Sequence, residues 1–186
     1  GEIIWAGKDL IGPSTSTGIT IGDKLCFMGN LSGSLFAVDP AVRKRQWKLN
    51  LWLGDEYRPL HSTPAWREST LYIGTHYGTL TALDVQSQEK IWEFYTQPAL
   101  LNPSHRVPFA QEHGPVLSSP VISGDIIYFG SVDGWFYAVS RTTGKGIWKY
   151  EIGSPIMTSA AVSGNTVFVG ALDGNLYAFT RQEQPH

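Results

Sequence analysis

The sequence predicts an all-β fold made of four repeated units, each of about four short antiparallel strands. Three observations predict it: an internal repeat that runs the length of the chain, turn residues at fixed offsets within each copy, and β-branched and aromatic runs between the turns. No segment has a convincing apolar period of 3.6 residues over the length of a helix. The 186 residues suffice for one well-packed domain or for part of a larger one.

The repeat is most regular in the second half of the chain. Residues 118–130 align without gaps with residues 158–170, residues 62–74 form a third copy, and residues 16–29 form a fourth. Glycine follows four residues after the glycine that ends each of these segments, and alanine follows four residues later. These positions are Gly33, Gly78, Gly134 and Gly174, then Ala37, Ala82, Ala138 and Ala178. Tryptophan comes ten residues after the alanine in three copies, at Trp47, Trp92 and Trp148.

Turn chemistry divides each copy into strands. Gly22-Asp23, Gly124-Asp125 and Gly164-Asn165 stand where tight hairpins need positive φ, and Asp133-Gly134 and Asp173-Gly174 mark the next turn. Radial repetition of such four-stranded sheets is a β-propeller. The predicted blades are residues 14–50, 61–96, 117–152 and 157–180, with residues 1–7 completing the last one.

The pattern Ala-x-Asp-x-x-Thr-Gly-x-x-x-Trp resembles the tryptophan-docking motif of PQQ-like (quinoprotein-type) β-propellers. The third copy matches it at Ala138, Thr143, Gly144 and Trp148, with Ser140 where aspartate is usual. The first two copies lack the Thr-Gly pair. The resemblance implies a ring of seven or eight blades. It assigns a structural docking role between neighbouring blades to Trp5, Trp47, Trp92 and Trp148.

The fourth copy would place its tryptophan at position 188, past the last residue of the sequence. Residues 1–5, Gly-Glu-Ile-Ile-Trp, reproduce the tail of the motif, so residues 1–7 are predicted to be the outermost strand of that blade. Three interpretations stay open. The strand closes a four-bladed ring within one chain, it closes an eight-bladed ring as a homodimer, or the chain is a fragment of a longer propeller.

Composition limits the classes of partner. The net charge of −2 provides no basic field for nucleic acid, and no apolar run is long enough to span a membrane. Cys26 is alone, so no intrachain disulfide is possible and the redox compartment is undecided. The expected location is periplasmic or extracellular if a leader was removed, and otherwise cytoplasmic.

Two long connections, residues 53–61 and 98–115, are predicted to lie on one face of the propeller with the turn at His76. The candidate binding residues on this face are Tyr57, Arg58, His61, His76, His105, Arg106 and His113. The histidines lack a fixed metal-ligand spacing, so no metal is predicted, and no catalytic residue is assigned.

These features favour a non-enzymatic binding module or scaffold that holds a protein or a small ligand through this face. One alternative is a fragment of a PQQ-binding quinoprotein oxidoreductase, although the adjacent cysteine pair and the calcium ligands implied by that resemblance have no match here. A metal-dependent hydrolase using His61, His76, His105 and His113 is a weaker alternative. We therefore predict no bound cofactor, and PQQ is the cofactor whose binding should be tested.

Overall fold

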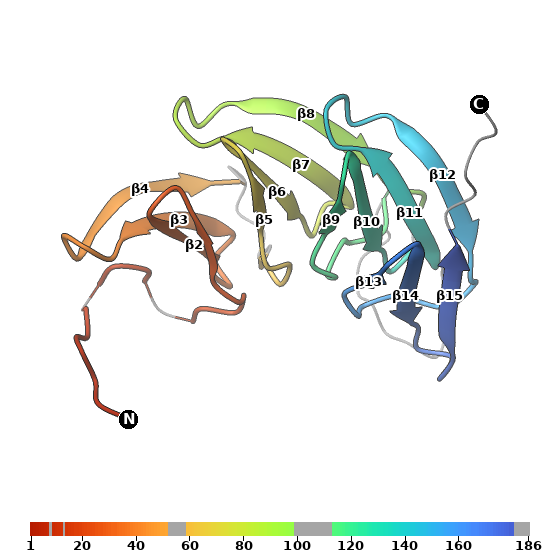
Figure 1. Ribbon diagram of the computed structural model, residues 1–186, viewed down its shortest axis with the longest axis horizontal. Helices are drawn as coiled ribbons and strands as arrows, with labels where there is room; N and C mark the ends of the chain where they lie inside the picture. The colour runs from red at the N-terminus through yellow and green to blue at the C-terminus, as the bar shows by residue number, and fades with distance from the viewer. Residues whose placement is uncertain (8, 13, 52–58, 99–112, 181–186) are drawn as a thin grey trace.

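The computed structural model describes residues 1–7, 9–12, 14–51, 59–98 and 113–180, and the described residues contain fifteen strands and no helix (Figure 1). The first sheet consists of β1 (Thr20–Gly22), β2 (Leu25–Gly29), β3 (Ser34–Asp39) and β4 (Lys44–Asn50). The second consists of β5 (Ala65–Arg67), β6 (Thr70–Gly74), β7 (Thr79–Asp84) and β8 (Lys90–Tyr95). The third consists of β9 (Val121–Ser123), β10 (Ile126–Gly130), β11 (Trp135–Ser140) and β12 (Gly146–Glu151). The last has three strands, β13 (Ala161–Ser163), β14 (Thr166–Gly170) and β15 (Leu176–Thr180).

Each sheet is an antiparallel meander, so the predicted all-β propeller architecture is confirmed. The same register recurs: the repeat alanine of the third strand pairs with the repeat tryptophan of the fourth, as in Ala138↔Trp148, and a bulge follows at once. The bulge occurs at the equivalent place in the first two sheets. The sheets are called blades 1 to 4 below.

The turns follow the predicted glycine pattern with one difference. The glycine after each second strand has φ between 74° and 85°, and Gly124 and Gly164 have φ of 59° and 56°. At the first hairpin the positive φ falls on Asp23 and Lys24 instead. Gly22 has a different role, because a Cβ there would lie 2.1 Å from the Trp66 ring of blade 2. This glycine permits close contact between blades.

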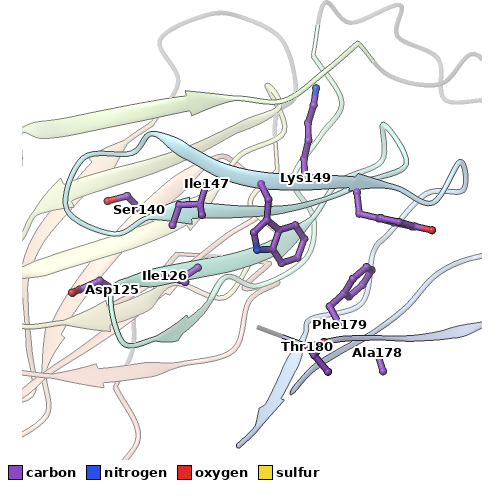
Figure 2. Close-up of a pocket in the computed structure, with 10 residues that line it drawn as sticks. Asp125, Ile126, Ser140, Ile147, Lys149, Ala178, Phe179 and Thr180 are labelled. Carbon is purple, nitrogen blue, oxygen red and sulfur yellow. The ribbon is translucent and has the colours of Figure 1, made fainter. Parts of the chain in front are cut away.

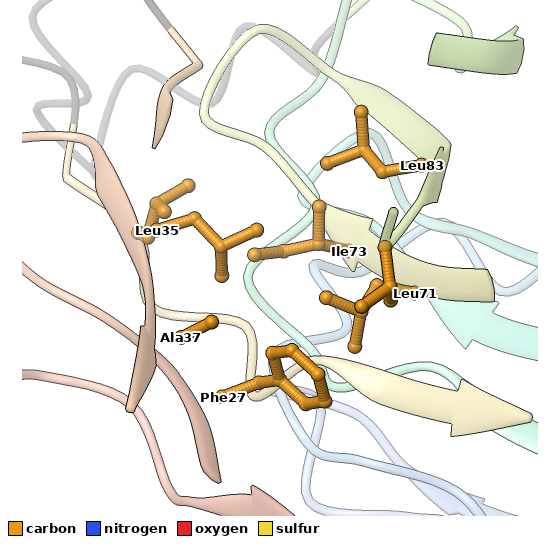
Figure 3. Packing of buried hydrophobic residues seen from close by; sticks show 8 residues of the cluster. Phe27, Leu35, Ala37, Leu71, Ile73 and Leu83 are labelled. Carbon is orange, nitrogen blue, oxygen red and sulfur yellow. The ribbon is translucent and has the colours of Figure 1, made fainter. Parts of the chain in front are cut away.

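The core lies between the blades. Phe27, Leu35 and Ala37 of blade 1 face Leu71, Ile73 and Leu83 of blade 2, and all six are at most 5% exposed (Figure 3). Equivalent residues fill the next two seams, with Tyr128, Phe136 and Ala138 of blade 3 packing against Val167 and Val169 of blade 4. Each blade therefore has a forward face toward the following blade and a rear face toward the preceding one.

The four blades fan out along an arc with its two ends apart (Figure 1). The rear face of blade 1 is covered by Leu10 and Ile11, which pack against Met28, Phe36 and Val38. The forward face of blade 4 is uncovered by the described residues: Leu176 is 74% exposed, whereas its counterparts Leu35, Leu80 and Phe136 are each 0% exposed. Residues 1–7 form no strand and lie at the opposite end of the arc from β15, so a ring closed within one chain is not formed in this structure.

Candidate functional site

A repeated hydroxyl clamp fixes where each blade begins. Ser118 Oγ donates to Gly130 O at 2.7 Å and accepts from Gly130 N at 2.9 Å. Thr158 makes the same pair of bonds with Gly170, and Gly74 N donates to Ser62 Oγ. The serine or threonine of the repeat therefore ties the start of each blade's first strand to the end of its second strand.

A second set of hydroxyls links one blade to the next. Gly18 N donates to Thr63 Oγ1 at 2.8 Å, and Thr63 N donates to Ser119 Oγ at 3.0 Å. Ser119 N in turn donates to Ser159 Oγ at 3.0 Å. We call this series the hydroxyl ladder. It joins the innermost strands of all four blades, and its outer member, Ser159, belongs to the uncovered blade.

The connections between blades run over the turns between second and third strands. Leu60 N donates to Asn30 O, Val116 N to Thr75 O, and Ile156 N to Ser131 O, at 3.0 to 3.1 Å. The same three side chains pack where a Cβ on the strand-ending glycine of the preceding blade would lie. This is the loop face of the molecule, and the described ends of the two long connections, residues 59–61 and 113–116, lie on it.

Three of the predicted histidines gather on the loop face around the blade 2 turn, Thr75–Gly78. The rings of His61 and His76 are 6.5 Å apart between centroids. His113 packs on Gly78 and lies 5.0 Å from the Tyr95 ring, with its Nδ1 2.7 Å from Thr96 O. The structure thus brings together residues that are 52 positions apart in the chain.

The base of the 98–115 connection is clamped at both ends. Thr96 Oγ1 donates to Gly78 O at 2.9 Å and to Gly114 O at 2.8 Å, and Gly114 N donates to Gln97 O at 2.7 Å. Gln97 N donates to Asp133 Oδ2 at 2.9 Å. His113 is therefore held on a rigid base that joins blades 2 and 3.

Asp133 and Tyr137 form a buried polar pair beneath that base, and the Tyr137 hydroxyl donates to Asp133 Oδ2. Burial raises the pKa of Asp133, and the hydrogen bonds from Tyr137 and the backbone only partly offset it. Burial, followed by the Asp133 charge, raises the pKa of Tyr137 as well. Asp173 and Tyr177 repeat the pair in blade 4, where both are solvent-accessible. The buried pair holds the backbone N–H of Gln97 at the base of the connection.

The other predicted site residues, Tyr57, Arg58, His105 and Arg106, lie outside the described residues. Within the described ranges, no group of three or more His, Cys, Asp or Glu side chains is placed to hold a metal ion. No helix in those ranges is long and apolar enough to cross a membrane. The candidate site is therefore the group formed by His61, His76, His113 and Tyr95.

A pocket of about 920 Å³ lies elsewhere, between β12 and β15 (Figure 2). Ile147, Trp148 and Tyr150 line one side, and Ala178, Phe179 and Thr180 line the other. At the preceding seam the equivalent tryptophan is covered by the turn after β11. The pocket lies at the seam between blades 3 and 4, away from the histidines of the loop face.

Trp92 shows how a repeat tryptophan packs. Its Nε1 donates to Arg141 O of blade 3 at 3.1 Å, and its ring occupies the place where a Cβ on Gly144 would lie. The Arg43 guanidinium carbon lies 5.9 Å from the centroid of the Trp5 ring. Trp66 also packs across a seam, on Gly22, although its position outside the repeat pattern gave no signal for this contact.

Comparison with known proteins agrees with this geometry. A family model described as outer membrane protein assembly factor BamB matches residues 104–184. A lanthanide-dependent methanol dehydrogenase of Methylacidiphilum fumariolicum is 32% identical over 80 residues, or 42% of this chain and 10% of that protein. The quinohemoprotein alcohol dehydrogenase ADH IIB of Pseudomonas putida is 27% identical over 105 residues, or 56% of this chain and 14% of that protein. These matches show that the repeats of this chain are similar to those of the PQQ-like β-propeller family.

Solved structures support the fold of this PQQ-like propeller. BamB from Moraxella catarrhalis superposes with a TM-score of 0.69 at 19% identity, covering 89% of this chain and 46% of that one. The computationally designed Ika4 protein superposes with a TM-score of 0.71 at 13% identity, covering 97% of this chain and 98% of that one. The chain thus spans a small part of the two dehydrogenases and about half of this BamB. At these identities the structural likeness concerns the fold alone.

Proposed function

We propose that this PQQ-like propeller is a non-enzymatic scaffold that binds a protein or small-ligand partner on its loop face. The observation that carries the proposal is the group of His61, His76, His113 and Tyr95 around the Thr75–Gly78 turn. Aromatic and imidazole rings on a fixed base present contact area with little conformational entropy to lose on binding.

The rigid base supports a binding role. His113 is held by Thr96 O and by packing on Gly78, and the stems of its connection are bonded to each other. His61 is exposed, and His76 and His113 are half-buried. A partner would therefore meet a preformed surface at the foot of both long connections, and loops on a rigid scaffold are the usual carriers of binding function.

The test compares two triple variants in a quantitative capture assay. The first changes His61, His76 and His113 to serine. The control changes Glu68, Asp125 and Lys145 to serine, in turns at the opposite ends of the strands. We expect partners of the unmodified chain to be lost from the histidine variant and kept by the control, with both variants melting cooperatively. Equal retention by a folded histidine variant would contradict the proposal.

The matched dehydrogenases favour one alternative, part of a PQQ-dependent oxidoreductase. The described residues fit that cofactor poorly, because they contain no cluster of three acidic, histidine or cysteine side chains that suits a metal ion. Cys26, the sole cysteine of the chain, packs at the blade 1 face beside Met28 and Leu10. Titration with PQQ and calcium or a lanthanide tests the alternative; saturable quinone absorbance would support it over the scaffold.

A further inference from the structure

We propose that Glu93 positions the histidine group of the loop face through two sets of hydrogen bonds within blade 2. One set runs through buried threonine hydroxyls to the Thr75–Gly78 turn, and the other runs through Tyr95 to the ring of His113. The effect on partner binding rests on the proposed loop-face function. The positioning itself is measured without a partner.

A chain of hydroxyls lies on the rear face of blade 2, in the seam with blade 1. Thr75 Oγ1 and Thr79 Oγ1 are 2.6 Å apart, and Thr79 Oγ1 and Thr81 Oγ1 are 3.2 Å apart. Thr81 Oγ1 donates to Glu93 Oε1 at 3.2 Å. The three threonines are 3 to 5% exposed, so water does not replace these hydrogen bonds. The chain of hydroxyls therefore joins the outer strand β8 to the turn that carries His76.

Glu93 ends this chain of hydroxyls as a carboxylate. Its side chain is 20% exposed, and its Oε2 accepts from Lys90 Nζ at 2.8 Å and from the Tyr95 hydroxyl at 2.7 Å. Burial raises the pKa of Glu93, but the hydrogen bonds from Lys90, Tyr95 and Thr81 outweigh it, so the pKa lies below its usual range. At neutral pH the group is therefore ionised and only accepts hydrogen bonds.

The carboxylate sets the direction of every hydrogen bond in the chain of hydroxyls. Each hydroxyl has one proton to donate, so Thr81 donates to Glu93, Thr79 donates to Thr81, and Thr75 donates to Thr79. The lone pairs of Thr75 Oγ1 then accept from the backbone N–H groups of Tyr77 and Thr79, each at 3.3 Å. The ionised state of Glu93 thus fixes the hydrogen bonds that hold the loop-face turn.

Tyr95 provides the second connection. Its hydroxyl donates to Glu93, and its ring lies 5.0 Å from the His113 ring. Because Tyr95 is 52% exposed, packing covers only about half of the side chain, and the hydrogen bond to the carboxylate fixes the ring. His113 therefore packs against a ring that Glu93 holds in place, as well as against Gly78.

Blade 2 departs from the repeat both at the histidine and beneath it. Where blade 2 has His76, the other blades have Leu31, Val132 and Leu172. Where blade 2 pairs Thr81 with Glu93, blades 1 and 3 pair an aromatic residue with a lysine, as Phe36↔Lys48 and Tyr137↔Lys149. Packing between blades therefore does not require a carboxylate at this position, and a role specific to the blade 2 turn accounts for it.

The first experiment follows the Tyr77 amide by NMR at neutral pH. Glu93→Gln introduces a side chain that donates as well as accepts, so the direction of the hydroxyl hydrogen bonds is no longer fixed. We expect the Tyr77 amide resonance to shift and its hydrogen exchange to become roughly twofold to tenfold faster, the range for one weakened hydrogen bond. Thermal melts confirm that each variant is folded.

Two backgrounds show whether this response travels through the threonines. Thr79→Val removes the middle hydroxyl and keeps the shape of the side chain, so Glu93→Gln should no longer affect the Tyr77 amide. Thr79→Ser keeps the hydroxyl, so the response should return. An equal response in the Thr79→Val background, or no response in the unmodified background, would overturn the threonine connection.

The second experiment follows the ring resonances of His113. Tyr95→Phe removes the hydrogen bond to Glu93 and keeps the aromatic ring, while Glu93→Ala removes the acceptor. We expect each change to shift the His113 resonances, and the double variant to shift them no further than either one, because both remove the same bond. Additive shifts, or no shift in Tyr95→Phe, would overturn the Tyr95 connection.

Partner capture measures the consequence for the site. Among partners that the triple histidine variant loses, Thr79→Val should weaken capture by roughly twofold to tenfold, and Thr79→Ser should keep it. Unchanged capture by Thr79→Val would leave the loop-face function standing and overturn its dependence on the threonines. If the histidine variant keeps every partner, the loop-face function fails, and the two NMR experiments still decide whether Glu93 positions the histidines.

Discussion

At the scale of single residues, glycines with two different functions occupy the turns. Gly144 has φ of 68° and also accommodates the Trp92 ring, because an added Cβ would lie 2.6 Å from Trp92 Cδ2. Gly124 has φ of 59°, and no atom lies within 4 Å of the place of its Cβ. A substitution at Gly124 therefore tests backbone strain alone, whereas a substitution at Gly144 tests backbone strain together with packing against Trp92.

Alanine substitutions at these two glycines measure the contact between blades. We expect Gly124→Ala to lower the unfolding free energy by about 1 kcal/mol, because alanine is strained in the left-handed conformation. Gly144→Ala adds displacement of Trp92, and we expect a total of about 2 to 4 kcal/mol. Urea denaturation of both variants makes the comparison. Equal losses would mean that Trp92 does not dock as described.

Glu93 provides a prediction that depends on pH. Burial raises the pKa of Glu93, but hydrogen bonds from Lys90 at 2.8 Å and Tyr95 at 2.7 Å outweigh it, so the net pKa lies below the ordinary value of 4.5. A lowered carboxyl pKa stabilises the fold above pH 4.5, and this contribution is lost as the pH falls through the folded-state value.

We expect Glu93→Gln to lower the unfolding free energy at pH 7 by about 0.5 kcal/mol, since Lys90 is half exposed and solvent screens the pair. The difference from the unmodified chain should shrink as the pH falls below 4.5. Urea midpoints at pH 7 and pH 3 test this, with Glu151→Gln on exposed β12 as the control. A difference in unfolding free energy that grows as the pH falls would contradict this prediction.

At the scale of elements, the same hydroxyl clamp is placed in two environments. Ser118 is 1% exposed and bonds both backbone groups of Gly130, while Thr158 makes the equivalent bonds at an exposed position of blade 4. Loss of a buried clamp leaves two backbone groups unsatisfied, whereas water replaces an exposed one.

We therefore expect Ser118→Ala to lower the unfolding free energy by about 2 kcal/mol and Thr158→Ala to lower it by less than about 1 kcal/mol. Thermal or urea unfolding of the two variants provides the measurement. A larger loss for Thr158→Ala would show that water does not replace the exposed clamp of blade 4.

At the scale of the whole molecule, stability should decline from the middle blades toward blade 4. Blade 3 has packed neighbours on both sides, but blade 4 is covered only on its rear face. In a repeat architecture, the stability of each unit depends on its nearest neighbours. An end blade with one seam opens more readily than a blade with two.

Amide hydrogen exchange tests this gradient. In dilute protein, we expect β13–β15 to exchange at least tenfold faster than β9–β12. Equal protection of blades 3 and 4 would argue against the gradient.

The sequence by itself determined the blades, because each blade is a local meander whose turns need glycine and whose strands need β-branched or aromatic residues. The periodic Gly, Ala and Trp positions were enough to assign the fold and the repeat family. The pair Gly22-Asp23 was predicted to stand where positive φ is needed. The structure gives positive φ to Asp23 and Lys24 but not to Gly22, whose packing against Trp66 is invisible in a local pattern.

Only the tertiary structure decided what depends on neighbours distant in the chain. His61, His76 and His113 have no common spacing. They meet because His61 enters blade 2 beside the Thr75–Gly78 turn and the connection that carries His113 leaves blade 2 across the same turn. The contact of Trp5 with Arg43 likewise joins residues that are far apart in the sequence. Short-range preferences fix each sheet, but the surfaces where sheets meet are fixed by packing between residues far apart in sequence.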